Sequence, residues 1–143
     1  MSYTPNLDTP AGRVTTNIVV FACAVSAGVH AGLVPEHLRT EPRLGIAFIT
    51  AVALLLAVGG TAAVRPWDRR VAAVAALLLA GLIAAYWATR STGIPLLAPD
   101  AEAVDAIGVI TTLVEAFGLV SAVALTQSLS RRTRRPILQE VTR

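Results

Sequence analysis

The sequence has one cysteine, no lysine and few aromatic residues, and each shortage excludes a class of protein. The single cysteine, Cys23, excludes a disulfide within the chain and any chemistry that needs a cysteine pair. We interpret it as a small packing residue. All 12 basic residues are arginines. They lie at the ends of apolar runs and do not alternate with aromatic side chains, so the sequence predicts no nucleic-acid partner.

Several enzyme motifs are also missing. The sequence contains no GxSxG nucleophile elbow, no HExxH zinc motif, no phosphate-binding Walker loop and no glycine-rich dinucleotide turn. These absences exclude the common hydrolases, nucleotide-dependent enzymes and dehydrogenases. The sequence leaves an enzymatic role open but leans against one.

Charge is scarce and apolar residues are abundant. Of the 143 residues, 15% are charged and 55% are hydrophobic, and the mean hydropathy is +0.66. A soluble domain of this size leaves a large share of its surface in water and could not bury so much apolar area. The composition predicts an all-α integral membrane protein whose main partner is the lipid bilayer, placed in the cell membrane.

Four apolar runs are long enough to form membrane spans. About 20 residues of helix cross a hydrocarbon core of roughly 30 Å, and we expect spans at about residues 14–34, 44–64, 71–89 and 101–128. The spans would form one transmembrane domain, residues 14–130. A polar N-terminal tail (1–13), with no cleaved signal peptide, and a basic C-terminal tail (131–143) would flank it.

Two residues are expected to set helix boundaries. Pro35 has no N–H to donate to the preceding turn, so it should end the first helix or start a short new one. Residues 36–43 would then form a tight connection. Asp100 is the expected N-cap of the fourth helix, and Glu102 and Asp105 would add favourable negative charge in its first turns.

The distribution of arginine orients the chain in the membrane. If both termini are cytoplasmic, nine of the 12 arginines lie inside, and three lie outside, namely Arg39, Arg43 and Arg90. The positive-inside rule favours this arrangement. We therefore expect an up-and-down four-helix bundle with both termini in the cytoplasm, and this orientation places both histidines at the outer side.

The stretch from Val29 to Leu38 holds both histidines and is the first candidate site. His30 lies in the first apolar run, and Glu36 and His37 follow Pro35 directly. Imidazole binds transition metals readily. His30 and His37 are two turns apart and would share a face if the helix continued past the proline. The alternatives are a packing histidine at position 30 and an exposed Glu-His pair at 36–37.

Glu115 is the second candidate, because it is the only ionisable residue deep in an expected span. It lies about 15 Å along the helix from Asp105, near the bilayer midplane. A charge there costs about 2.5–3.5 kcal/mol, so the carboxyl must find a partner, face protein or water, or be protonated. Cys23, Ser26 and His30 share one face of the first helix and are the candidate partners. Contact between Glu115 and His30 stays open, as does a packing role for Glu115.

The fourth helix also carries a stripe of polar and small residues that includes Glu115. At helical spacing, Glu102, Asp105, Gly108, Thr111 or Thr112, Glu115 and Gly118 share a face. We expect this face to point into the bundle.

One motif carries a resemblance. The run His-Ala-Gly-Leu-Val-Pro-Glu-His-Leu, residues 30–38, with Glu41-Pro42 and Leu44-Gly45 after it, resembles small four-span membrane proteins of actinobacteria. The resemblance implies the four-span layout and assigns no activity, cofactor or residue role.

Three functional hypotheses follow. The leading one is an outward-facing site that binds a transition metal ion or relays protons, built from His30, Glu115, Glu36 and His37. Haem is the less favoured cofactor, because both histidines come from the first helix and its exit. The second hypothesis is a small-solute or ion carrier in which Glu115 exchanges a proton. The third is a structural subunit, and we expect a homo-oligomer or a partner membrane protein.

Overall fold

Four α-helices make up the regular structure of the part of the chain that the structure describes. The structure, a computed structural model, describes residues 10–95, 97 and 100–141. Its helices, in chain order, are α1 (Pro10–Thr40), α2 (Pro42–Val64), α3 (Arg69–Ser91) and α4 (Ala106–Val141). The all-α prediction is confirmed.

Each helix is long and apolar enough to cross a membrane. The most apolar 18-residue windows have mean hydropathies of 2.0 to 2.2, and at most 28% of the residues in any of these windows are buried inside the bundle. Large side chains such as Phe21, Leu77 and Phe117 point outwards instead. Apolar residues that the bundle leaves uncovered need a lipid solvent, which supports the predicted multi-pass membrane protein.

The predicted helix end at Pro35 is wrong. Helix α1 continues through Pro35 to Thr40, and the expected connection over 36–43 shrinks to Glu41, the one non-helical residue before α2. A proline removes one hydrogen bond from a helix, and neighbouring helices make that loss tolerable in membrane spans. Here Gly45 lets α2 approach α1 closely, because a Cβ at this position would lie 2.7 Å from Leu38 Cδ2. This contact supports the helical turn that follows Pro35.

The predicted start of the fourth helix is also wrong. Helix α4 begins at Ala106 and not near residue 101, and its first N–H groups are capped by Asp105, whose Oδ1 accepts from Gly108 N at 2.7 Å. The residues before it belong to the connection, which is tied to α3 because Glu102 N–H donates to Thr89 O at 2.9 Å. Asp100 is exposed and lies five residues before the cap.

The helices pack as a ring in which one of the four contacts between neighbouring helices is small. Helix α1 packs against both α2 and α4, and α4 packs against α3, whereas the contact between α2 and α3 is the smallest of the four. The central core consists of small and aliphatic residues: Val19, Cys23, Ala27, Leu55, Ala75, Leu79 and Ala122. Small residues allow the helix backbones to approach closely, as is common between membrane helices.

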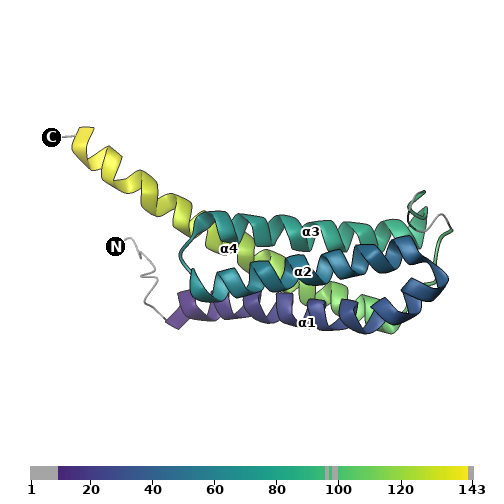
Figure 1. Cartoon of the computed structure of the whole chain (residues 1–143). Helices are drawn as coiled ribbons and strands as arrows, with labels where there is room; N and C mark the ends of the chain where they lie inside the picture. Colours follow the sequence, from purple (N-terminus) through teal and green to yellow (C-terminus); the bar gives the residue numbers. More distant parts are fainter. Residues whose placement is uncertain (1–9, 96, 98–99, 142–143) are drawn as a thin grey trace.

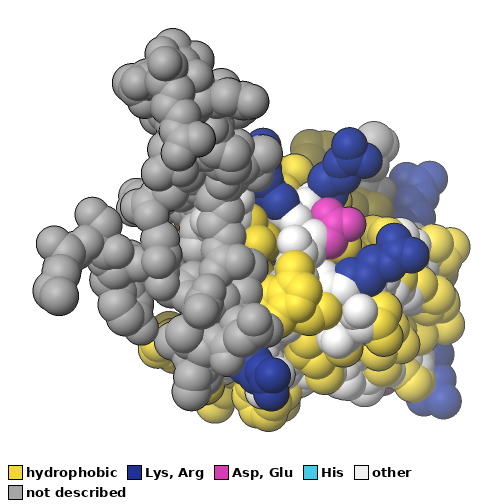
Figure 2. Space-filling view, turned by 90° about the vertical axis from the view of Figure 1, so that its left-hand side faces the viewer, with side chains coloured by type: hydrophobic (Ala, Val, Ile, Leu, Met, Phe, Trp, Pro, Cys, Tyr) yellow, Lys and Arg dark blue, Asp and Glu magenta, His cyan; other side chains and the backbone are white. Residues whose placement is uncertain are grey.

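The two ends of the bundle differ in charge. Figure 1 places the start of α1, the 65–68 turn and the far end of α4 at one end. Figure 2 shows arginine side chains gathered around this end, which includes Arg65, Arg69 and Arg70. We call it the arginine end. Glu41 and the 92–105 connection lie at the opposite end, which we call the connection end.

Gly118 tests the packing of α1 on α4. A Cβ at Gly118 would lie 2.5 Å from Ala22 Cβ, too close for any contact between methyl groups. Replacing Gly118 with alanine forces the helices apart, and overpacking of this kind typically costs about 1–3 kcal/mol. We expect G118A to lower the thermal unfolding midpoint of the purified protein by several degrees.

Gly81 on α3 is the matched control, because a Cβ there meets nothing within 4 Å. G81A should keep or raise the midpoint, since alanine is the better helix former. Equal midpoints for G118A and the wild-type protein would contradict the packing described here.

Candidate functional site

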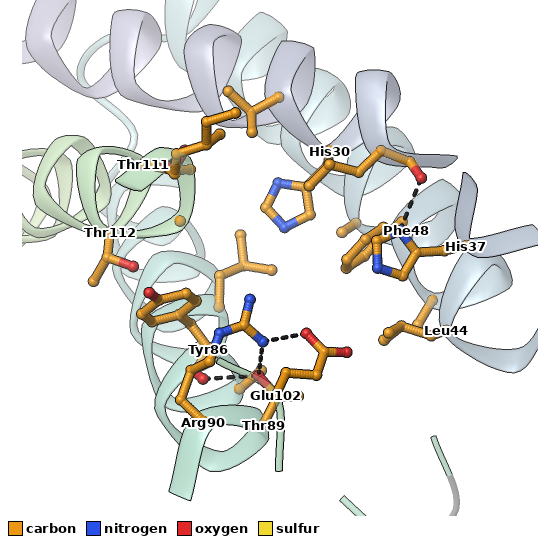
Figure 3. Close-up of a pocket in the computed structure, with 18 of the residues that line it drawn as sticks. His30, His37, Leu44, Phe48, Tyr86, Thr89, Arg90, Glu102, Thr111 and Thr112 are labelled. Carbon is orange, nitrogen blue, oxygen red and sulfur yellow. Dashed lines mark hydrogen bonds and ion pairs between the residues drawn. The ribbon is translucent and has the colours of Figure 1, made fainter. Parts of the chain in front are cut away.

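A cavity of about 290 Å³ lies between the helices toward the connection end. All four helices and the 92–105 connection line it, and its volume is close to the lower limit of small-molecule sites, roughly 300 Å³. Most of the wall is apolar, with Leu33, Ala51 and Leu82 among the lining residues. Figure 3 shows Thr89, Arg90 and Glu102 close together on one side of the cavity and His30 on the other.

Glu115 lines the inner end of the cavity, and Ser26 lies directly behind it, outside the lining. Glu115 is 2% exposed and Ser26 is fully buried. The Ser26 hydroxyl donates a hydrogen bond to Glu115 Oε1 at 2.5 Å, which links α1 to α4. The same hydroxyl oxygen lies 3.4 Å from His30 Nδ1. Ser26 therefore stands between the two side chains that the sequence singled out.

The backbone fixes the ring orientation of both histidines. His30 Nδ1 lies 2.8 Å from the carbonyl oxygen of Ser26, and His37 Nδ1 lies 2.9 Å from that of Leu33. A carbonyl oxygen only accepts, so each Nδ1 carries a proton and Nε2 of each neutral ring keeps its lone pair. Figure 3 shows the ring of His30 pointing into the cavity.

Phe48 of α2 holds the two histidine rings in place. Its ring meets both in edge-to-face geometry, with centroid distances of 5.3 Å to His30 and 4.6 Å to His37. This arrangement depends on the unbroken α1 helix, which puts the histidines two turns apart on one face. Edge-to-face contacts of this kind stabilise ring positions.

Arg90 organises the charged group at the connection end. Its guanidinium pairs with Glu102 and, at 2.9 Å, with Asp105 Oδ2. It also lies 4.9 Å from the centre of the Tyr86 ring, a cation–π contact. The Arg90 side chain is only 13% exposed, whereas that of Asp105 is 48% exposed. The cluster therefore joins the end of α3 to the residues before α4 and reaches the surface of the protein.

The pKa of Asp105 is lowered from its ordinary value. The main cause is the hydrogen bond from the Gly108 backbone N–H, and the hydrogen bond from Arg90 adds to it. Both donors favour the charged carboxylate. Asp105 therefore stays ionised and serves at once as the cap of α4 and as a partner of Arg90.

The structure brings three of the four predicted site residues to one cavity. His30, His37 and Glu115 line it, whereas Glu36 is exposed on α1 and does not. The contact of Glu115 with His30, left open by the sequence, runs through Ser26. Among the residues that the structure describes, no group of three or more His, Cys, Asp or Glu side chains is placed to hold a metal ion.

Two residues of the site were missed by the sequence reasoning. Arg90 was counted only as an outer arginine, and Tyr86 was not proposed as a site residue. The structure puts Arg90 and Tyr86 in the cavity wall, and Trp87 is exposed. The signal was present, since Tyr86 and Arg90 are four residues apart on one helix face, and acidic residues follow at 102 and 105.

The sequence matches no family model, and no curated protein or solved structure is significantly similar to it.

The pH dependence of stability tests Asp105. Because its pKa is lower in the folded protein, its stabilising contribution is fully present above the unfolded value, about 3.9. This contribution is lost as the pH falls through the lowered folded pKa. We expect the thermal midpoint of the wild-type protein to drop between pH 5 and pH 2, and D105N to show a smaller drop from a lower starting value.

The control is D100N, which makes the same chemical change at an exposed carboxylate outside the cap. D100N should follow the wild-type curve. If the thermal midpoint of D105N also followed the wild-type curve over this pH range, the role assigned to Asp105 would be wrong.

Proposed function

We propose that the protein is a proton-coupled carrier of a small solute in the cell membrane, with Glu115 as its proton-binding group. The observation that carries this proposal is a buried carboxyl at the inner end of a cavity of solute size. An ionised carboxyl in a membrane interior is costly and calls for a proton or a ligand beside it. A carboxyl that needs either a proton or a ligand beside it can exchange one for the other.

The arginine end supports the orientation that belongs to this proposal. Arg65, Arg69 and Arg70 lie in or next to the 65–68 turn, at the same end as the start of α1 and the far end of α4 (Figure 1). The positive-inside rule then puts this end and both termini in the cytoplasm, with the four spans running up and down. The cavity lies toward the other end, so we propose that it faces outwards.

His30 and Ser26 supply a route for the proton. The His30 ring points into the cavity and keeps the Nε2 lone pair, so it can take a proton from the outer side. The Ser26 hydroxyl lies within reach of His30 and donates to Glu115. Hydroxyl and imidazole groups both donate and accept, which suits them to a relay. The proposed carrier thus includes the proton relay of the leading hypothesis from the sequence, and adds a solute that exchanges with the proton.

The metal version of the site has less support. Glu36 is exposed and does not line the cavity. Among the described residues, His30 and His37 have no third ligand beside them that would complete a metal site. Transition metal sites usually take three or four protein ligands. The proposal therefore assigns His30 to the proton route.

Proton movement in vesicles tests the proposed function. Protein reconstituted in proteoliposomes with an internal pH dye would be exposed to small cationic, neutral and anionic solutes in turn. We expect at least one solute to drive proton movement through the wild-type protein, and E115Q to reduce it at least tenfold. Glutamine keeps an oxygen that accepts from Ser26, so the change removes the titratable proton and leaves the hydrogen bond.

E36Q is the control, because it neutralises an exposed glutamate outside the cavity. Its proton movement should equal that of the wild-type protein. If no solute moves protons, or if E115Q is as active as the wild-type protein, the carrier proposal is wrong.

A further inference from the structure

We infer that the solute is a small organic cation, which takes the place of the proton on Glu115. This inference rests on the proposed proton-coupled function and adds the chemical class of the solute. It is carried by the charges that line the cavity, by the partners of Glu115 and by the character of the walls.

The described charges of the lining have an excess of acid. One base, Arg90, stands against three acids, Glu102, Asp105 and Glu115. Arg90 is already paired with Glu102 and Asp105, so it gives no countercharge to Glu115. With Glu115 protonated the lining carries a net charge of 1 − 2 = −1, and with Glu115 ionised 1 − 3 = −2. An anionic solute would be repelled in both states.

Glu115 is the acid that needs a countercharge. Its hydrogen-bond partner is the hydroxyl of Ser26, which is neutral. Apart from the charged residues already named, the titratable side chains that line the cavity are His30 and His37 on α1 and Tyr86 on α3. The lining residues of α2 are all apolar. Cys23 lies one turn from Ser26 on α1 and brings no positive charge. While the His30 and His37 rings are neutral, no described side chain of the lining compensates an ionised Glu115, so the solute supplies the positive charge.

The cavity wall favours an organic cation over a metal ion. Aromatic rings of Phe48 and Tyr86 line the space together with aliphatic side chains (Figure 3). Ammonium groups bind well against aromatic faces, and their alkyl parts gain from apolar contact. A metal ion would instead require several oxygen or nitrogen ligands around one point, and within the described chain no such group is found.

The exchange balances in charge and protons. The protonated carboxyl of Glu115 releases one proton, and the carboxylate that remains pairs with one monovalent cation. No covalent bond other than O–H is broken, and the net charge of the cavity is the same before and after. One cation bound therefore corresponds to one proton released.

Equilibrium binding to the purified full-length protein tests this inference. The probes are benzyltrimethylammonium and the smaller tetramethylammonium as cations, benzyl alcohol as a neutral compound and benzenesulfonate as an anion. Calorimetry in two buffers of different ionisation enthalpy gives both the Kd and the number of protons released. We expect a cation to bind with release of about one proton, and its Kd to fall about tenfold per pH unit while Glu115 is protonated.

Two variants sharpen the test. E115Q should weaken cation binding at least tenfold and remove both the proton release and the pH dependence. E36Q should bind as the wild-type protein does. Failure of both cations to bind, cation binding without proton release, or equally tight binding of benzenesulfonate or benzyl alcohol would overturn the inference.

The two proposals can fail separately. If a neutral or anionic solute drives the Glu115-dependent proton movement in vesicles, the carrier function holds and the organic cation is wrong. If a cation binds with proton release while no solute moves protons in vesicles, the cation site holds and the carrier function is wrong.

Discussion

The need to satisfy one carboxyl in the middle of a membrane bundle underlies the rest of the structure. Glu115 meets that need through Ser26 on the neighbouring helix. The bond can form because Gly118, one turn further along α4, lets Ala22 of α1 come close. Small residues thus set the distance between two helices, and that distance sets the geometry of the polar pair.

The sequence predicted the parts of the structure that depend on solvent and composition. Four apolar runs gave four spans, and the depth of Glu115 marked it as the residue that needed a partner. It did not predict the features that depend on tertiary contact. Pro35 stays inside α1 although proline disfavours a helix, with α2 packed closely against the turn that follows. Counting the arginines of each loop does not distinguish an exposed arginine from a buried, paired one. The partners of Arg90, which lie 12 and 15 residues later in the chain, were therefore identified only from the fold.

The cluster around Arg90 and the buried Glu115 differ in how their charges are stabilised. Near the connection end, two acids share one cation, Arg90, and Asp105 remains partly in water. At the inner end a single acid has a neutral partner and little exposure. In the proposed carrier, the first group can stay charged throughout the cycle, whereas Glu115 changes its protonation state whenever a solute enters or leaves. This contrast is why the proposals rest on Glu115 and not on the larger charged cluster.

The unequal connections have a mechanical consequence. One residue, Glu41, joins α1 to α2, so these two helices form a stiff hairpin, while α3 and α4 are joined by the longer 92–105 segment that Arg90 fastens at its base. The seam between α2 and α3 has the least packing to lose. The two helix pairs meet closely along α1 and α4 and least along α2 and α3. Separating α2 from α3 therefore breaks the fewest contacts, and Ser26 and Glu115 lie at the contact that such an opening would keep.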